Sequence, residues 1–217
     1  MFIGHFGVGF AAKKIDRRPS LGTLFLASQF IDLLWPFFLL FGLEKVIVDP
    51  GNTAFTPLDF VYFPFSHGLA SVLIWSVLFG AIYYLFKRNL KGSLLTGSLV
   101  TSHWLLDLVT HRPDLPLVPW SEYKVGLGLW NSILFTLLVE ILIFVGGTAL
   151  YMHVTRAVNR RGVVTLWALL LFLLAMYLIN VFGPPPPSED PIAIVSMSMW
   201  LLVAWGYWID RNRRPVE

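Results

Sequence analysis

The sequence predicts an all-α, polytopic membrane protein with six transmembrane helices and an N-terminal half-helix or re-entrant segment. Of its 217 residues, 56% are hydrophobic and only 13% are charged, whereas charged residues make up about 25% of a typical soluble protein. The mean hydropathy is +0.69, and six apolar segments are each long enough to cross a bilayer as a helix. Most Lys and Arg residues fall in alternate connections between these segments, as a membrane protein requires.

The N-terminal part begins with a short apolar stretch and continues into the first long segment. Residues 1–12 are rich in Gly and contain His5; as a helix rising about 1.5 Å per residue they reach only halfway across a bilayer. After a basic turn, residues 21–43 form the first predicted span, which carries Asp32. Pro36 should kink this span, because proline lacks the backbone N–H that a helix interior needs.

The rest of the chain supplies five more predicted spans. They cover residues 65–86, 93–110, 129–152, 163–182 and 192–209. We expect one integral membrane domain, 1–217, in which residues 1–152 hold the functional core and residues 163–209 add two spans. A proline run at 184–187 forms a stiff extended spacer between those two spans.

The distribution of basic residues predicts the orientation. Thirteen of the sixteen Lys and Arg lie in the basic turn, two connectors and the C-terminal tail, and only Lys45, Arg112 and Lys124 lie on the other side. Such an excess marks the cytoplasmic side. We therefore expect a prokaryotic inner (cell) membrane protein with a cytoplasmic C-terminus. Its partners should be membrane lipids and no nucleic acid, since the basic residues lie in loops.

The most informative motif lies in the third predicted span. His103, Asp107 and His111 recur every four residues, so a helix places them on one face. Ionisable groups in an apolar helix are costly unless they are paired, bind a metal or face a wet cavity. A His and an Asp one turn apart can share a metal ion.

Several other ionisable residues fall at a similar depth, in the middle-to-outer half of the bilayer. With the motif they make six groups that could converge on one pocket: His5, Asp32, His67, His103, Asp107 and Glu140. Taken singly, Asp32 or Glu140 could equally be a neutral helix-packing group, and His67 could be an interfacial ring. His111 could be solvated at the start of a loop. The collective pattern favours a polar site.

The donor types suggest the chemistry of such a site. The chain has no Cys, which excludes thiolate metal sites and disulfides. His and carboxylate ligands suit a divalent metal, with Zn the first expectation and Mn or Fe as alternatives. Metals with open positions support hydrolysis, so we expect Asp32, His103 and Asp107 to be catalytic.

These motifs also resemble a known family. Gly4-His5, Asp32, Ser66-His67 and the run from Ser102 to Asp107 are similar to those of bacterial membrane-bound, metal-dependent hydrolases. That family is related to the zinc-dependent phospholipase C superfamily, which also contains single-strand nucleases and has an ordered series of ligands on an all-helical core. The resemblance covers residues 1–140.

The resemblance implies three metal positions. The first would be held by Asp32, His67, His103 and Asp107. The second would be held by His5 and Asp107 with the Met1 amine, and the third by His111 and Glu140. The chain departs from the superfamily at Thr136, where a His is usual, and in the close spacing of His111 to Asp107.

The leading functional hypothesis is therefore a membrane-embedded, metal-dependent hydrolase of a phosphoester or lipid-linked substrate. One alternative is an ion- or proton-coupled transporter or channel that uses buried Asp32, Asp107 and Glu140. Another is a non-catalytic membrane scaffold with a structural metal. The lack of a visible internal repeat argues against the transporter.

Overall fold

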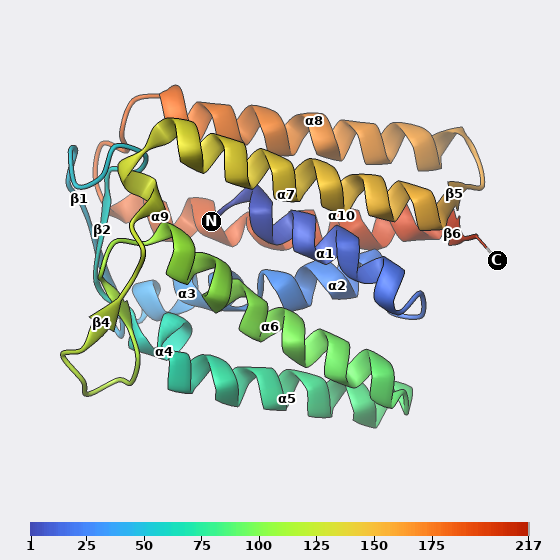
Figure 1. The fold of residues 1–217 in the computed structure, drawn as a ribbon, viewed down its shortest axis with the longest axis horizontal. Helices are drawn as coiled ribbons and strands as arrows, with labels where there is room; N and C mark the ends of the chain where they lie inside the picture. The colour runs from blue at the N-terminus through green and yellow to red at the C-terminus, as the bar shows by residue number, and fades with distance from the viewer. Residues whose placement is uncertain (217) are drawn as a thin grey trace.

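The apolar segments fold into helices that run along one long axis, with short strands at the two ends (Figure 1). The computed structural model describes residues 1–216. Three long, regular helices are α5 (Leu69–Lys87), α7 (Ile133–Val154) and α8 (Arg160–Phe182). A fourth helical stretch combines α9 (Asp190–Met197) and α10 (Met199–Arg211). Their exposed faces carry many large apolar side chains, such as Phe86, Leu142 and Leu201, as lipid contact requires.

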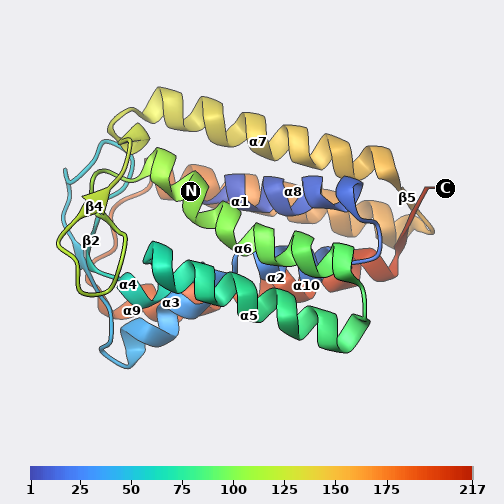
Figure 2. The ribbon, with the colours of Figure 1, turned by 60° about the horizontal axis from the view of Figure 1, so that its bottom comes forward.

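The predicted helical character is confirmed, but the predicted number of six spans is not supported. Four helices in the described chain are long and apolar enough to cross a membrane, or five if one bent pair counts as a span. The predicted third span forms α6 (Leu90–Thr110), which lies antiparallel to α5 (Figures 1 and 2). Gly, Ser, Thr, His and Asp residues make α6 too polar to pass as a spanning helix, and most of these polar and small residues are buried inside the protein.

The predicted first span is broken, but not where the sequence indicates. It forms α2 (Leu21–Ser28) and α3 (Phe30–Leu40), which are bent by 56°. Pro36 lies inside α3, and the predicted kink at this residue stays a prediction. The break falls at Gln29, where the carbonyl oxygen of Ser28 contacts His103 Nδ1 at 2.7 Å. A side chain that competes for a helical carbonyl is a recognised cause of a bend.

The short N-terminal helix α1 (Ile3–Ile15) is the centre of the bundle. It packs against α7, α2 and α6 (Figures 1 and 2). Its first turn is capped from outside the helix, because Glu140 Oε2 on α7 accepts the N–H groups of Phe2 at 2.8 Å and Gly4 at 3.1 Å. A carboxylate is favourable there because the first N–H groups of a helix have no partner within it.

Short strands and turns close both ends of the bundle. At one end lie α4 (Pro64–His67), the 3-10 helix η1 (Leu129–Asn131) and two antiparallel pairs, β1 (Lys45–Val48) with β2 (Leu58–Tyr62) and β3 (Leu115–Pro116) with β4 (Lys124–Val125). At the other end β5 (Thr155–Ala157) pairs with β6 (Arg213–Pro215). The first end brings α3, α4 and α6 together and so shapes the site described below.

Two glycines allow α1 and α7 to approach closely. A Cβ atom on Gly147 would overlap the carbonyl oxygen of Gly7, whereas a Cβ atom on the neighbouring Gly146 would meet nothing within 4 Å. We expect Gly147→Ala to lower the free energy of unfolding by about 1–3 kcal/mol, the usual cost of overpacking. Gly146→Ala is the matched control and should be neutral or stabilising, because Ala favours helix by about 1 kcal/mol. Thermal unfolding in detergent would show this, and equal transition temperatures for the two variants would contradict it.

Candidate metal centre

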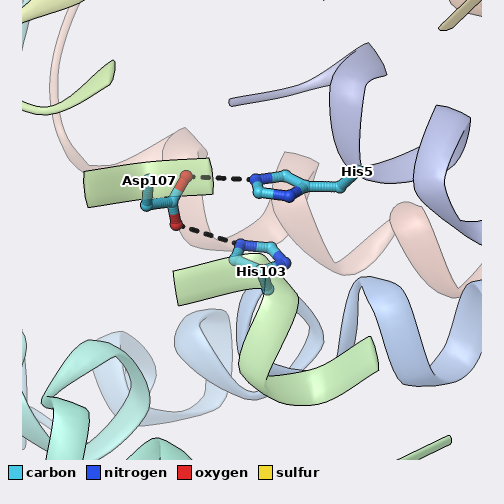
Figure 3. A group of neighbouring side chains, drawn as sticks. All are labelled: His5, His103 and Asp107. Carbon is cyan, nitrogen blue, oxygen red and sulfur yellow. Dashed lines mark hydrogen bonds and ion pairs between the residues drawn. The ribbon is translucent and has the colours of Figure 1, made fainter. Parts of the chain in front are cut away.

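Five of the predicted site residues come together where α1, α3, α4 and α6 meet. His5 is in the first turn of α1, Asp32 follows the break between α2 and α3, and His67 ends α4. His103 and Asp107 lie one turn apart on α6, and their side chains meet that of His5 (Figure 3). All except Asp32 are almost fully buried; the Asp32 side chain is 22% exposed and forms the open side of the cluster.

Four distances describe the first group of donors. His67 Nε2 lies 3.2 Å from Asp32 Oδ1 and 3.8 Å from Asp107 Oδ2. His103 Nε2 lies 3.5 Å from Asp32 Oδ2 and 3.2 Å from Asp107 Oδ2. Ligands of a tetrahedral Zn ion, bound at 2.0–2.2 Å, stand about 3.3–3.6 Å apart. The observed spacing is therefore close to that of a zinc coordination shell.

The hydrogen bond at the far side of His103 determines which ring nitrogen carries a proton. Nδ1 lies 2.7 Å from the carbonyl oxygen of Ser28, which can only accept, so Nδ1 must donate. In the neutral imidazole, Nε2 then presents a lone pair. Nε2 is buried and has no hydrogen-bond partner among residues 1–216, although two carboxylates lie close to it. A cation would resolve this electrostatic conflict.

His67 is held in a similar way, by a side chain. Its Nδ1 lies 2.7 Å from Ser66 Oγ, and Ser66 Oγ donates to Glu44 Oε2 at 2.6 Å. Burial raises the pKa of Glu44, while its hydrogen bonds from Ser66 and Phe65 act in the opposite direction. Nε2 of His67 is thus also directed at the carboxylates, and it lies within hydrogen-bond distance of Asp32 Oδ1.

A second group of donors shares residues with the first. His5 Nε2 lies 3.1 Å from Asp107 Oδ1, and the nitrogen of Met1 lies 2.5 Å from the same oxygen. The His5 ring stacks on the His103 ring, with centroids 3.5 Å apart and planes 9° from parallel. Asp107 therefore presents one oxygen to His5 and the other to His103, as Figure 3 shows. This arrangement is suited to a carboxylate that bridges two sites.

The structure places Glu140 and His111 in other interactions. Glu140 caps α1, and His111 Nδ1 pairs with Asp114 Oδ1 at 2.9 Å while its ring packs on Trp130 with centroids 4.2 Å apart. Within the described chain, neither belongs to the two groups whose ligand atoms lie within 4.8 Å of one another. Metal binding by these two residues stays a prediction.

Sequence reasoning missed two supports of the site. The carbonyl of Ser28 carries no sequence signal, because any residue at a helix break would supply one. Glu44 is an acidic residue at the edge of a long apolar segment, and it is 4% exposed. Its position at the end of that segment was the available signal, but Ser66 lies 22 residues further along the chain, so the sequence does not show their contact.

The bundle of apolar helices around a buried His and carboxylate cluster defines this chain as an integral membrane protein. A family model described as YdjM inner membrane protein matches residues 58–186. The chain therefore belongs to the YdjM inner membrane protein family. No curated protein and no solved structure gave a match.

The family agrees with the predicted inner membrane location and with a bacterial membrane protein family. It gives no support to the predicted relation to hydrolases or phospholipase C. The cytoplasmic C-terminus and the depth of the pocket stay predictions. The matched region contains His67, His103 and Asp107, while His5 and Asp32 precede it.

Proposed function

We propose that this protein is a membrane-embedded, metal-dependent hydrolase that acts on a phosphoester or lipid-linked substrate. One observation carries the proposal. The Nε2 atoms of His67 and His103 both face the carboxylates of Asp32 and Asp107 at 3.2–3.8 Å, while both Nδ1 atoms are engaged on the far side. Ring nitrogens this close to buried carboxylates must share either a proton or a metal cation with them, and the metal-bound form is the one that we propose.

The donor set fits a divalent transition metal. Two imidazole nitrogens and two carboxylates, with acceptors behind the imidazoles, match zinc in its ligands and outer hydrogen bonds. Mn and Fe also accept this donor set. When bound, such a metal lowers the pKa of a coordinated water and stabilises charge on a phosphoryl oxygen.

The residues of the chain have distinct roles in this proposal. His67 and His103 hold the metal through Nε2, and Asp107 links the two donor groups. Asp32 holds the metal and borders the approach, because its side chain is the least buried of the four. The stacked His5 ring covers His103 and keeps water from that face. Placement among membrane helices favours a lipid phosphoester, which can approach from the bilayer.

The break between α2 and α3 also supports a second candidate, a cation transporter. Transporters often bind ions where a membrane helix is interrupted, and Asp32 lies three residues beyond the break at Gln29. Transport would require flux between the two sides of a vesicle. Hydrolysis would require only access from one side.

We expect vesicles of phosphatidylethanolamine and phosphatidylglycerol that contain the protein to release a soluble phosphate-bearing headgroup when Zn or Mn is supplied. A chelator should stop the release, and Asp107→Asn should lower it at least about 100-fold, beyond the usual cost of changing an outer ligand support. Asp49→Asn is the control, because Asp49 lies in an exposed turn. Headgroup release is read by phosphorus analysis of the supernatant. No release from a metal-loaded protein that shows chelator-insensitive cation flux would favour the transporter.

A further inference from the structure

A chain of hydrogen bonds behind His67 ends at the buried carboxylate of Glu44. Glu44 Oε1 accepts the N–H groups of Phe65 at 2.8 Å and Ser66 at 2.7 Å. Its other oxygen, Oε2, accepts the Ser66 hydroxyl at 2.6 Å. Ser66 Oγ then lies 2.7 Å from His67 Nδ1. Each of these three groups therefore donates a hydrogen bond to the Glu44 carboxylate.

The direction of these hydrogen bonds fixes the proton on His67. A carboxylate can only accept, so the Ser66 hydroxyl hydrogen points toward Glu44. The Ser66 oxygen is left to accept a hydrogen bond from His67 Nδ1. His67 Nδ1 must therefore carry a proton. Nε2 lies 3.2 Å from Asp32 Oδ1, and a carboxylate can only accept, so a proton occupies Nε2 when no metal is bound. Because Nδ1 keeps its own proton, Nε2 is the nitrogen that can exchange its proton for a metal ion. Metal ligands are commonly held in the correct tautomer by such a partner.

We propose that Glu44 and Ser66 are positioning residues that hold His67 in its metal-binding tautomer, an inference that rests on the proposed metal-dependent function. The same result is reached for His103 through the carbonyl of Ser28. The two imidazoles of the site are thus set by independent acceptors, one from a side chain and one from the backbone. Glu44 follows α3, the helix that carries Asp32, and its hydrogen bonds are to Phe65 and Ser66 of α4, the helix that ends at His67.

A purely structural role for Glu44 gives a different expectation. Its two contacts with N–H groups cap the start of α4, and a glutamine could still accept them through its carbonyl oxygen. Glutamine would, however, direct its NH₂ group toward Ser66. The Ser66 hydroxyl would then donate to His67 Nδ1, and the neutral ring would keep its one proton on Nε2, where it blocks metal binding.

We expect Glu44→Gln to weaken zinc binding by roughly 10–100-fold, the usual effect of losing such a support. Zinc affinity is measured by chelator competition on the purified full-length protein in detergent. Ser66→Ala should cause a smaller loss, because it removes the acceptor without delivering a proton to Nδ1. Glu44→Gln with Ser66→Ala should bind zinc more tightly than Glu44→Gln alone. If Glu44 only caps α4, the double variant should bind zinc no more tightly than Glu44→Gln alone.

The tautomer itself gives a second measurement, which does not require metal. Nitrogen-15 NMR of labelled, metal-free protein should show a proton on His67 Nδ1 in the parent and no proton on Nδ1 in Glu44→Gln. Glu189→Gln is the matched control, because Glu189 also accepts a backbone N–H, that of Val48, but at an exposed position. It should leave both the tautomer and the zinc affinity unchanged.

The outcomes separate this inference from the proposed function. A parent that binds zinc, with Glu44→Gln equal to it in affinity and tautomer, would overturn the positioning role alone. A parent that binds no zinc would overturn the metal-dependent function, while the NMR measurement would still decide whether Glu44 sets the tautomer. If Glu44→Gln fails to fold, Ser66→Ala decides: an unchanged His67 tautomer and an unchanged zinc affinity in that variant would also overturn the positioning role.

Discussion

Replacing His103 with alanine should strip the purified protein of its bound metal. His103 belongs to both donor groups, its Nε2 faces Asp32 and Asp107, and its ring supports the His5 ring. The affinity should fall by more than the roughly 10–100-fold that follows loss of an outer support. Mass spectrometry of the metal content per mole of detergent-solubilised protein would measure this.

The matched control is His153→Ala. His153 is an exposed histidine in the last turn of α7, so its loss should leave the metal content unchanged. Circular dichroism and the thermal transition must show that both variants remain folded. Equal metal content in the two folded variants, or no metal in the parent, would contradict the metal centre. The metal content of His5→Ala should lie between those of His103→Ala and His153→Ala, because His5 belongs only to the second donor group.

The gathering of the five clustered residues could be predicted because two kinds of information agree. The spacing of four places His103 and Asp107 on one helical face. The order of the apolar segments gives Asp32 and His67 a similar depth, and the short N-terminal segment gives His5 the same depth. Depth and helical face are both readable in a sequence, and here they were sufficient to bring the side chains to one place.

The positions of Glu140 and His111 required information that the sequence does not contain. Depth is only one coordinate, and the rotation of α7 about its axis decides whether Glu140 faces the metal ligands or the start of α1. Close packing of Gly147 against Gly7 fixes that rotation. His111 ends α6 and turns toward Asp114 and Trp130, because the backbone leaves the helix at this residue.

The predicted number of spans is not supported, for a related reason. A segment that supplies ligands must carry polar residues, so α6 loses the hydropathy that marks a spanning helix. The bend between α2 and α3 similarly depends on a contact with His103, which is distant in sequence. In both cases the site alters the local pattern on which the prediction relied. Departures of this kind are expected where function and local preference conflict.

Lys13→Met should cause the largest loss of stability away from the site. Lys13 is 3% exposed, and its Nζ lies 2.8 Å from Asp210 Oδ2 and 2.8 Å from the carbonyl oxygen of Pro19. Asp210 also accepts the N–H of Leu21 and the hydroxyl of Tyr151. Removing one partner of a buried ion pair leaves an uncompensated charge, which costs about 3–5 kcal/mol. Reversible unfolding in mixed micelles would measure the free energy.

A second substitution identifies the cause. Asp210→Asn added to Lys13→Met removes the remaining charge, so the double variant should be more stable than Lys13→Met alone. Lys14→Met is the control, because Lys14 is an exposed neighbour. Since Glu140 holds the start of α1 and Asp210 its end, loss of Lys13 should release the end of the helix farther from His5. A Lys13→Met protein as stable as Lys14→Met would show instead that apolar and glycine contacts alone hold α1 in the bundle.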